Sequence, residues 1–170
     1  MKHIVLEFYK GNGKWATAVD KAILLVSKPH VHVEAKFENA LSFSSSQRAV
    51  EAGGNQEDKK VEGVRYKGIK YTNTKRWTEI ILCVTDEEYR RIKLTCDVLV
   101  AMHIGYDMRG AIGTVFTGKQ DPDKYFCSEV IYDAILSQWL PQGLNHKMHP
   151  QKLYDIVEVL APILASRFGV

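Results

Sequence analysis

The sequence has few cysteines and no long apolar run, and each shortage excludes a class of protein. Its 3 cysteines, Cys83, Cys96 and Cys127, are odd in number and widely spaced, which argues against a disulfide framework and against a CxxC metal or redox pair. No apolar run approaches the roughly 20 residues that cross a bilayer. The N-terminus, MKHIVLEFYK, turns to charge too soon for a signal peptide. We therefore expect at least one free thiol, no transmembrane segment and a cytoplasmic location.

The sequence also lacks a strong excess of charge of one sign. Its 170 residues carry a formal net charge of +3, with 45% apolar and 25% charged residues. This balance is that of an ordinary folded protein and excludes disordered and collagen-like chains. The length fits one domain, and no internal repeat or linker divides it. We expect residues 1–170 to form a single domain with one core and one site.

Positive charge is concentrated in one stretch, residues 53–77. The stretch could contact phosphate or a bacterial-wall anion, although charge runs are usually solvated loop and strand faces. One basic stretch without a recognised motif argues against a nucleic-acid role. We expect it to border a substrate groove or to solvate a sheet edge, and a catalytically inactive binding module with a basic surface stays open as an alternative. The stretch holds seven basic residues against three acidic ones: Lys59, Lys60, Arg65, Lys67, Lys70, Lys75 and Arg76 against Glu57, Asp58 and Glu62.

Alternating hydrophobicity predicts strands along the first half of the chain. A hairpin turn is expected at Glu38-Asn39, and a surface loop is expected over residues 51–60. The simplest use of these runs is a curved antiparallel sheet. The strand-like runs cover residues 3–9, 31–37, 41–46, 61–67, 68–72 and 77–84.

Helical spacing of apolar residues predicts the rest of the fold. Thr85 with Glu88 three residues later forms a capping-box pattern at the start of one helix. Pro162 is expected to interrupt or kink the last helix, and residues 105–120 are expected to form a glycine-containing loop with a short helical piece. The fold class is therefore α+β, an antiparallel sheet with helices packed against it. The helical patterns cover residues 15–26, 86–103, 127–135 and 150–160.

Cys127 lies where a loop becomes a helix, which is a place that can make a thiol reactive. The N-terminus of a helix stabilises a thiolate through its unpaired N–H groups and its dipole. Asp121-Pro122 could cap the helix earlier, which would leave Cys127 beyond the first turn. The alternative interpretation is a buried core cysteine, because Cys127 shares an apolar stripe with Val130 and Ile131.

A cysteine nucleophile needs a base, and His32 is the best candidate in the sequence. Glu34 projects from the same strand face, and a hairpin register that pairs Phe37 with Ala40 would bring His32 opposite Ser45, or opposite Ser44 with a longer loop. Either partner could fix the tautomer of the ring and support the imidazolium. The plainer alternative is a partly exposed surface histidine, a solvated carboxylate and serines bonded to their own backbone.

The same strand permits a metal-binding alternative. His30 and His32 alternate as a His-x-His pair, and Glu34 continues the row. Two histidines and one carboxylate can hold a divalent ion such as zinc, although the sequence shows no clear fourth ligand.

Several pieces of the sequence together resemble a known superfamily. Their order along residues 6–153 resembles that of the circularly permuted NlpC-type papain-like cysteine hydrolases. These hydrolases include YiiX/YebB-type bacterial proteins and are distantly similar to lecithin retinol acyltransferase. The serine-rich strand looks most like bacteriophage and prophage members. The pieces are a first helix with Trp15, the strand His32-Val33-Glu34, a hairpin into Leu41-Ser42-Phe43-Ser44-Ser45-Ser46, Tyr106-Asp107 before a glycine-rich loop, Tyr125-Phe126-Cys127-Ser128-Glu129, and Pro150-Gln151-Lys152-Leu153.

The resemblance implies a function and a set of site residues. Cys127 would be the nucleophile and His32 the general base, with a polar third residue on the next strand. The relatives often carry histidine or glutamate at that third place, whereas this sequence offers Ser44 or Ser45, so Glu34 competes for the role. The implied reaction is thiol-dependent cleavage of, or transfer from, an amide or ester bond, without a metal or organic cofactor. The implied substrates are a peptide, a peptidoglycan fragment or an acyl ester, and a phage member could also act in the virion or the infected host cell.

Overall fold

The computed structural model describes residues 1–11, 18–25, 27–38, 41–46, 62–68, 74–107, 123–144 and 148–170. Within them, five antiparallel strands form one sheet in the order β4-β3-β2-β1-β5. This arrangement confirms the predicted antiparallel sheet. The strands are β1 (Lys2–Lys10), β2 (His30–Lys36), β3 (Leu41–Ser46), β4 (Gly63–Gly68) and β5 (Trp77–Val84).

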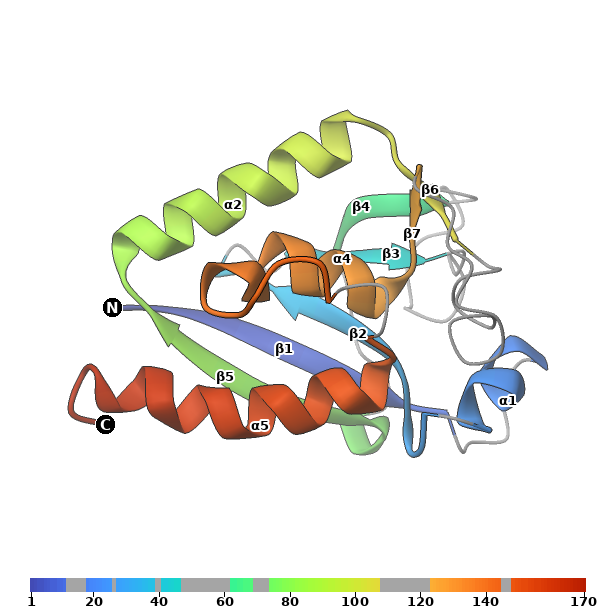
Figure 1. The fold of residues 1–170 in the computed structure, drawn as a ribbon, viewed down its shortest axis with the longest axis horizontal. Helices are drawn as coiled ribbons and strands as arrows, with labels where there is room; N and C mark the ends of the chain where they lie inside the picture. Colours follow the sequence, from blue (N-terminus) through green and yellow to red (C-terminus); the bar gives the residue numbers. More distant parts are fainter. Residues whose placement is uncertain are drawn as a thin grey trace.

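Three helices, α2, α4 and α5, cover one face of this sheet, while α1 lies beyond one end of it (Figure 1). Two short strands, β6 and β7, pair in parallel beside the start of α4. The result is the α+β architecture that the sequence predicts. The remaining elements are α1 (Ala18–Leu24), η2 (Thr74–Arg76), α2 (Asp86–Ala101), β6 (Gly105–Tyr106), β7 (Lys124–Tyr125), α4 (Cys127–Ala134), η3 (Leu136–Gln138) and α5 (Pro150–Ser166).

The two faces of the sheet differ in character. Alternate residues of each strand point to the helix-covered face and form the main core, among them Ile4, Leu6, Phe8, Ala35, Phe43 and Leu82. The opposite face, which we call the polar face, carries Glu7, Glu34, Ser42, Arg65 and Lys67. All five of these side chains are buried. Buried charges are stable only when they are paired or hydrogen-bonded. The polar face is therefore the part of the sheet where interacting charged and polar side chains are buried together.

The register of the β2–β3 hairpin differs from both predicted registers. Ala35 pairs with Phe43 and Lys36 with Ser42, and Phe37 N donates to Leu41 O at 3.1 Å. Partners that lie opposite each other share a sheet face, so this register places Phe43 beside Ala35 in the core. The prediction that His32 lies opposite Ser45 or Ser44 is therefore wrong.

The helix ends follow the sequence signals with one exception. Thr85 and Glu88 form the predicted capping box at the start of α2. Helix α5 begins at Pro150 and continues through Pro162 to Ser166, so the predicted interruption is wrong. Ala161 and Leu164 are buried against the core on either side of Pro162, and this packing holds the helix together although one backbone hydrogen bond is lost. No helix among the described residues is long and apolar enough to cross a membrane.

Some predictions fall on residues outside the described ranges. These are the start of the first helix at Trp15, the surface loop over 51–60, the strand-like run over 69–72 and the Asp121-Pro122 helix start. The predicted loop over residues 105–120 begins with the short strand β6 instead, and its remainder from residue 108 is likewise outside the description.

Candidate active site

Cys127 is the first residue of α4, with Phe126 as the N-cap, so the later of the two predicted helix starts is observed. Three hydrogen bonds fix this turn. Ser45 Oγ donates to Tyr125 O at 2.7 Å, Asp107 N donates to the same carbonyl at 3.0 Å, and Glu129 Oε2 accepts from Phe126 N at 3.3 Å. The thiol therefore lies at the positive end of the helix dipole, where a thiolate is stabilised.

The start of α4 fits into a gap between two strands. Pairing of β2 with β3 ends at Ala35 and Phe43, although residues 44–46 of β3 continue to pair with β4. Val33 faces this gap: its carbonyl accepts a hydrogen bond from Ser44 Oγ at 2.8 Å, and its N–H donates to the sulfur of Cys127. None of the described strands pairs with the N–H and C=O of Val33 in this gap. Cys127 and Ser44 form hydrogen bonds with them instead, as buried backbone groups require.

Cys127 and His32 interact directly, through a side-chain hydrogen bond and through charge. Burial alone would raise the pKa of the Cys127 thiol, but the charge and hydrogen bond of His32 and the N–H groups of Val33 and Ser128 lower it. Burial alone would lower the pKa of His32, whereas the Cys127 thiolate and then Glu34 raise it to about 10. Both shifts favour the thiolate–imidazolium form of the pair over the neutral form.

Glu34 bonds the ring of His32 on its far side. Its Oε1 lies 3.0 Å from His32 Nε2, which leaves Nδ1 as the ring nitrogen for the sulfur. Its Oε2 accepts a hydrogen bond from Ser42 Oγ at 2.7 Å. Burial would raise the pKa of Glu34, but His32, Ser42 and the charge of Arg65 hold it below its ordinary value. Glu34 is an ionised carboxylate that keeps the imidazole oriented and charged.

The predicted site residues divide into two groups in the structure. Cys127 contacts His32, and His32 contacts Glu34. The hydroxyls of Ser44 and Ser45 instead donate to the backbone carbonyls of Val33 and Tyr125, and so hold the backbone around the site. Ser42 is the residue that the sequence reasoning missed. A correct hairpin register would have indicated it, because Ser42 lies opposite Lys36 and diagonally across from Glu34 on the same face.

His30 does not join His32 and Glu34. Its Nδ1 lies 2.8 Å from Gln151 Oε1 and its Nε2 lies 3.3 Å from Thr78 Oγ1, while its ring stacks on Tyr154 at 4.5 Å between centroids. Burial lowers the pKa of His30. Within the described ranges, no three His, Cys, Asp or Glu side chains are arranged to hold a metal ion.

The two catalytic candidates are almost completely shielded from solvent. Cys127 is 3% exposed and His32 is 8% exposed, so water screens their charges poorly. A second small core borders them at this end of the sheet. It consists of Tyr9, Ile23, Val31 and Phe126, with Leu24, Trp77 and Tyr106 packed against it.

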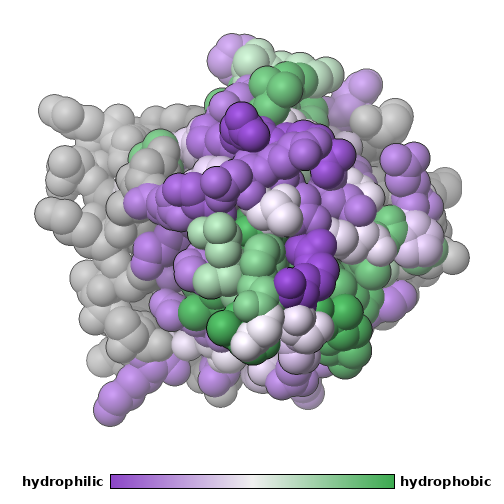
Figure 2. Space-filling model, turned by 90° about the vertical axis from the view of Figure 1, so that its left-hand side faces the viewer, coloured by the Kyte–Doolittle hydropathy of each residue, from purple (hydrophilic) through white to green (hydrophobic). Residues whose placement is uncertain are grey.

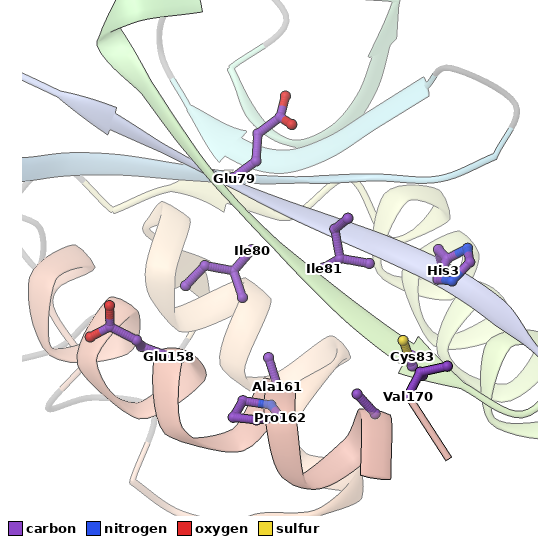
Figure 3. Close-up of a pocket in the computed structure, with 10 residues that line it drawn as sticks. His3, Glu79, Ile80, Ile81, Cys83, Glu158, Ala161, Pro162 and Val170 are labelled. Atoms are coloured by element: carbon purple, nitrogen blue, oxygen red, sulfur yellow. The ribbon is translucent and has the colours of Figure 1, made fainter. Parts of the chain in front are cut away.

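A separate groove of about 600 Å³ lies between β5 and α5 and shares no residue with the Cys127–His32 pair (Figure 3). Cys83, Ile81, Ala161 and Pro162 are among its lining residues. The side of the molecule that carries both chain ends shows green hydrophobic patches divided by purple hydrophilic side chains (Figure 2). Most of the lining of the groove is apolar, but it also includes His3 and Cys83, which lie opposite each other in the β1–β5 pairing, and the carboxylates of Glu79 and Glu158.

Comparisons of the chain with protein-family models, with curated proteins and with solved structures return no match. The functional conclusions below therefore rest on the geometry of the site.

Proposed function

We propose that this protein is a cysteine hydrolase that cleaves an amide or ester bond, or transfers the acyl group to another acceptor. The observation that carries the proposal is the side-chain hydrogen bond between Cys127 and His32, with the carboxylate of Glu34 holding the ring on its other side. A thiolate at a helix start, an imidazole beside it and a third group orienting the ring are the parts that nucleophilic catalysis requires.

In the first half of the reaction, Sγ of Cys127 attacks the carbonyl carbon of the substrate. The new C–S bond moves the carbonyl electrons onto oxygen, and the N–H of Cys127, which has no acceptor within its own helix at the first position of α4, is placed to donate to that oxyanion. The imidazolium of His32 then gives its proton to the leaving amine or alkoxide. The C–N or C–O bond breaks and a thioester on Cys127 remains.

In the second half, His32 acts in the opposite sense. Its neutral imidazole takes a proton from water, or from the acceptor in a transfer reaction, and the resulting nucleophile attacks the thioester carbonyl. The C–S bond breaks, the acid or transferred acyl product leaves, and the proton on His32 restores the ion pair. Glu34 stays ionised throughout and stabilises the imidazolium each time it forms.

We further propose that the fold is the permuted papain-like arrangement of NlpC-type hydrolases. The order of parts supports it, because the histidine strand β2 precedes the cysteine helix α4 in the chain and α4 docks against β2 and β3. A peptide, a peptidoglycan fragment and an acyl ester are the substrate classes this assignment brings with it, and either a peptidase or amidase or an acyltransferase fits the same pair of residues.

The test is acyl-enzyme formation with an activated ester such as p-nitrophenyl acetate. We expect a burst of p-nitrophenol at neutral pH and a mass increase of one acetyl group on the peptide that contains Cys127. The burst should be lost in Cys127→Ala and strongly reduced in His32→Ala. Cys83→Ala is the matched control and should keep the burst. Acetylation of other residues only, or a burst that survives Cys127→Ala, would refute the proposal.

A further inference from the structure

A row of rings leads away from the catalytic histidine across three strands. Tyr9 of β1 pairs with His32 of β2 on one side and with Trp77 of β5 on the other. The ring centroids of Tyr9 and Trp77 are 5.1 Å apart, and those of His32 and Trp77 are 6.5 Å apart. Tyr9 and His32 are buried, whereas Trp77 and Arg76 are partly exposed, so Trp77 carries this row of rings to the surface of the protein.

Arg76 stands at the far end of this row. It directly precedes Trp77, and its Nη1 donates to the hydroxyl of Tyr9 at 3.2 Å. A guanidinium carries five N–H donors in a planar fork that fits carboxylate and phosphate oxygens. Within the described part of the chain, Arg76 makes no ion pair with a carboxylate. The Arg76 side chain is partly exposed, and its guanidinium is held in place by the hydroxyl of Tyr9.

The other arginines near the sheet have different partners. Arg167 forms an ion pair with Glu88 at 2.8 Å, and Arg65 donates to the carbonyls of Ser46 and Gly63. Lys10, by contrast, lies at the same end of the sheet as Arg76, where it pairs with His30 and lowers the pKa of that histidine after the larger effect of burial. Lys10 and Arg76 are therefore two cations at the end of the sheet that holds the site.

We propose that Arg76 binds an oxyanion group of the substrate, a carboxylate or a phosphate, beside the bond that Cys127 attacks. This inference rests on the proposed hydrolase function and names a substrate class for it. Strand β1 lies between the strands of His32 and Trp77, so the backbones at these two residues are about 10 Å apart. A substrate that reaches both groups therefore carries its anionic group several bonds away from the reacting carbonyl, with the intervening chain beside Trp77.

The experiment measures how fast matched reagents alkylate Cys127. The anionic reagent is N-iodoacetyl-4-aminobutyrate, which places a carboxylate at about this reach, and the neutral reagent is its carboxamide. A third reagent carries a phosphonate in place of the carboxylate and distinguishes the two sources of oxyanion. The proteins are the wild type, Arg76→Gln, Arg76→Lys and the control Arg90→Gln on the exposed side of α2.

We expect the wild type to react faster with an anionic reagent than with the amide. The ratio of the two rate constants should fall about tenfold in Arg76→Gln, recover in part in Arg76→Lys, and stay unchanged in Arg90→Gln. The rate with the neutral reagent should be the same in all four proteins, which also shows that the variants are folded.

Two results would overturn the inference, and only the second would also overturn the proposed hydrolase function. An unchanged ratio in Arg76→Gln, with normal labelling of Cys127 by the amide, would refute the oxyanion site and leave the hydrolase proposal intact. Failure of the amide to label Cys127 in the wild type would refute both. A preference for the phosphonate over the carboxylate would assign the site to phosphate-bearing substrates.

Discussion

Glu34 of β2 lies directly opposite Glu7 of β1, and both carboxylates are buried on the polar face. Like charges placed opposite each other destabilise a sheet unless each has a cation of its own. Lys36 Nζ lies 3.8 Å from Glu7 Oε1, and Glu34 has the imidazolium of His32 and the charge of Arg65. Within the site, the charge of Glu34 therefore acts on His32.

Removing that charge should weaken the interaction of Cys127 with His32 while keeping a hydrogen-bond partner for the His32 ring. In Glu34→Gln we expect the pKa of His32 to fall and the alkylation of Cys127 by iodoacetamide at pH 7 to slow about tenfold, since a charge at hydrogen-bond distance shifts a pKa by one unit or more. NMR titration of the His32 ring measures the first effect and mass spectrometry the second. Glu87→Gln, on the exposed surface of α2, is the control. Equal rates in the two variants would show that Glu34 does not support the imidazolium.

The pH dependence of Cys127 alkylation should have two limbs. Because the pKa of the thiol is lowered, the rate should already be on its plateau at pH values where an ordinary thiol, with a pKa of 9.0, is mostly protonated. A second change should appear near pH 10, where His32 loses its proton. A single rise centred near pH 9, as for an unperturbed thiol, would contradict the ion pair.

The same shifts set a window of stability. His32 has a raised pKa, so its contribution is complete below its ordinary value of 6.5 and is lost as the pH rises through about 10. Glu34 has a lowered pKa, so its contribution is complete above its ordinary value of 4.5 and is lost as the pH falls below it. Urea midpoints of His32→Ala and the wild type should therefore differ more at pH 6 than at pH 11.

Comparing the three cysteines shows whether the pKa of a thiol or its exposure to solvent determines how fast it is alkylated. Cys83 is 8% exposed, Cys127 is 3% exposed and Cys96 is fully buried, so exposure alone ranks Cys83 first. The thiolate ranks Cys127 first, while burial raises the pKa of Cys96 and makes it the slowest. Brief treatment of the native protein with iodoacetamide, followed by peptide mass spectrometry, should label Cys127 before Cys83. Faster labelling of Cys83 would mean that access, and not charge, governs this protein's thiols.

The sequence predicts the candidate reactive residues of the site better than the strand register and the long-range contacts that surround them. Residue type and order indicate Cys127 and His32 as candidates, and the alternation of one strand indicates Glu34, all of which is local information. Ser42 was missed because the hairpin register depends on which residues share the core face. Arg76 and Trp77 come next to His32 only because β5 pairs with β1, a long-range contact that no local pattern reveals. The start of α4 was ambiguous because Asp121-Pro122 is as good a helix start as Phe126-Cys127.

Glu88 should be a stability residue without influence on the site. Its carboxylate joins three segments, accepting from Thr85 N at 2.8 Å, Trp139 Nε1 at 3.0 Å and Arg167 Nη1 at 2.8 Å. The Arg167 bond is the main cause that lowers the pKa of Glu88 to about 2. Glu88→Ala should lower the free energy of unfolding by roughly 2–4 kcal/mol, because a capping box and a partly buried ion pair are lost together. Cys127 alkylation should be unchanged at 20 °C, and a parallel loss of alkylation would show that the α2 end and the site are coupled.

Glu129 should make the protein less stable as the pH rises from acid to neutral. It is fully buried in the first turn of α4, where Oε2 accepts from Phe126 N and Oε1 has no hydrogen-bond partner among the described residues. Burial, opposed by the Phe126 N–H and reinforced by Asp133 and Asp107, raises its pKa from 4.5 to about 8. Between these values the folded state binds more protons than the unfolded state, so stability falls with rising pH.

In Glu129→Gln this slope should disappear, because glutamine keeps the acceptor for Phe126 N and does not titrate. Urea unfolding from pH 4.5 to 9 should show the variant gaining on the wild type up to about pH 8 and by a constant amount above it, on the order of a few kcal/mol. Glu158→Gln is the control: Glu158 lies on α5, its carboxylate accepts from Tyr154 Oη, and the variant should follow the wild type. If Glu129→Gln also followed the wild type at every pH, then Glu129 would titrate normally in the folded protein, with water or another group reaching its carboxylate.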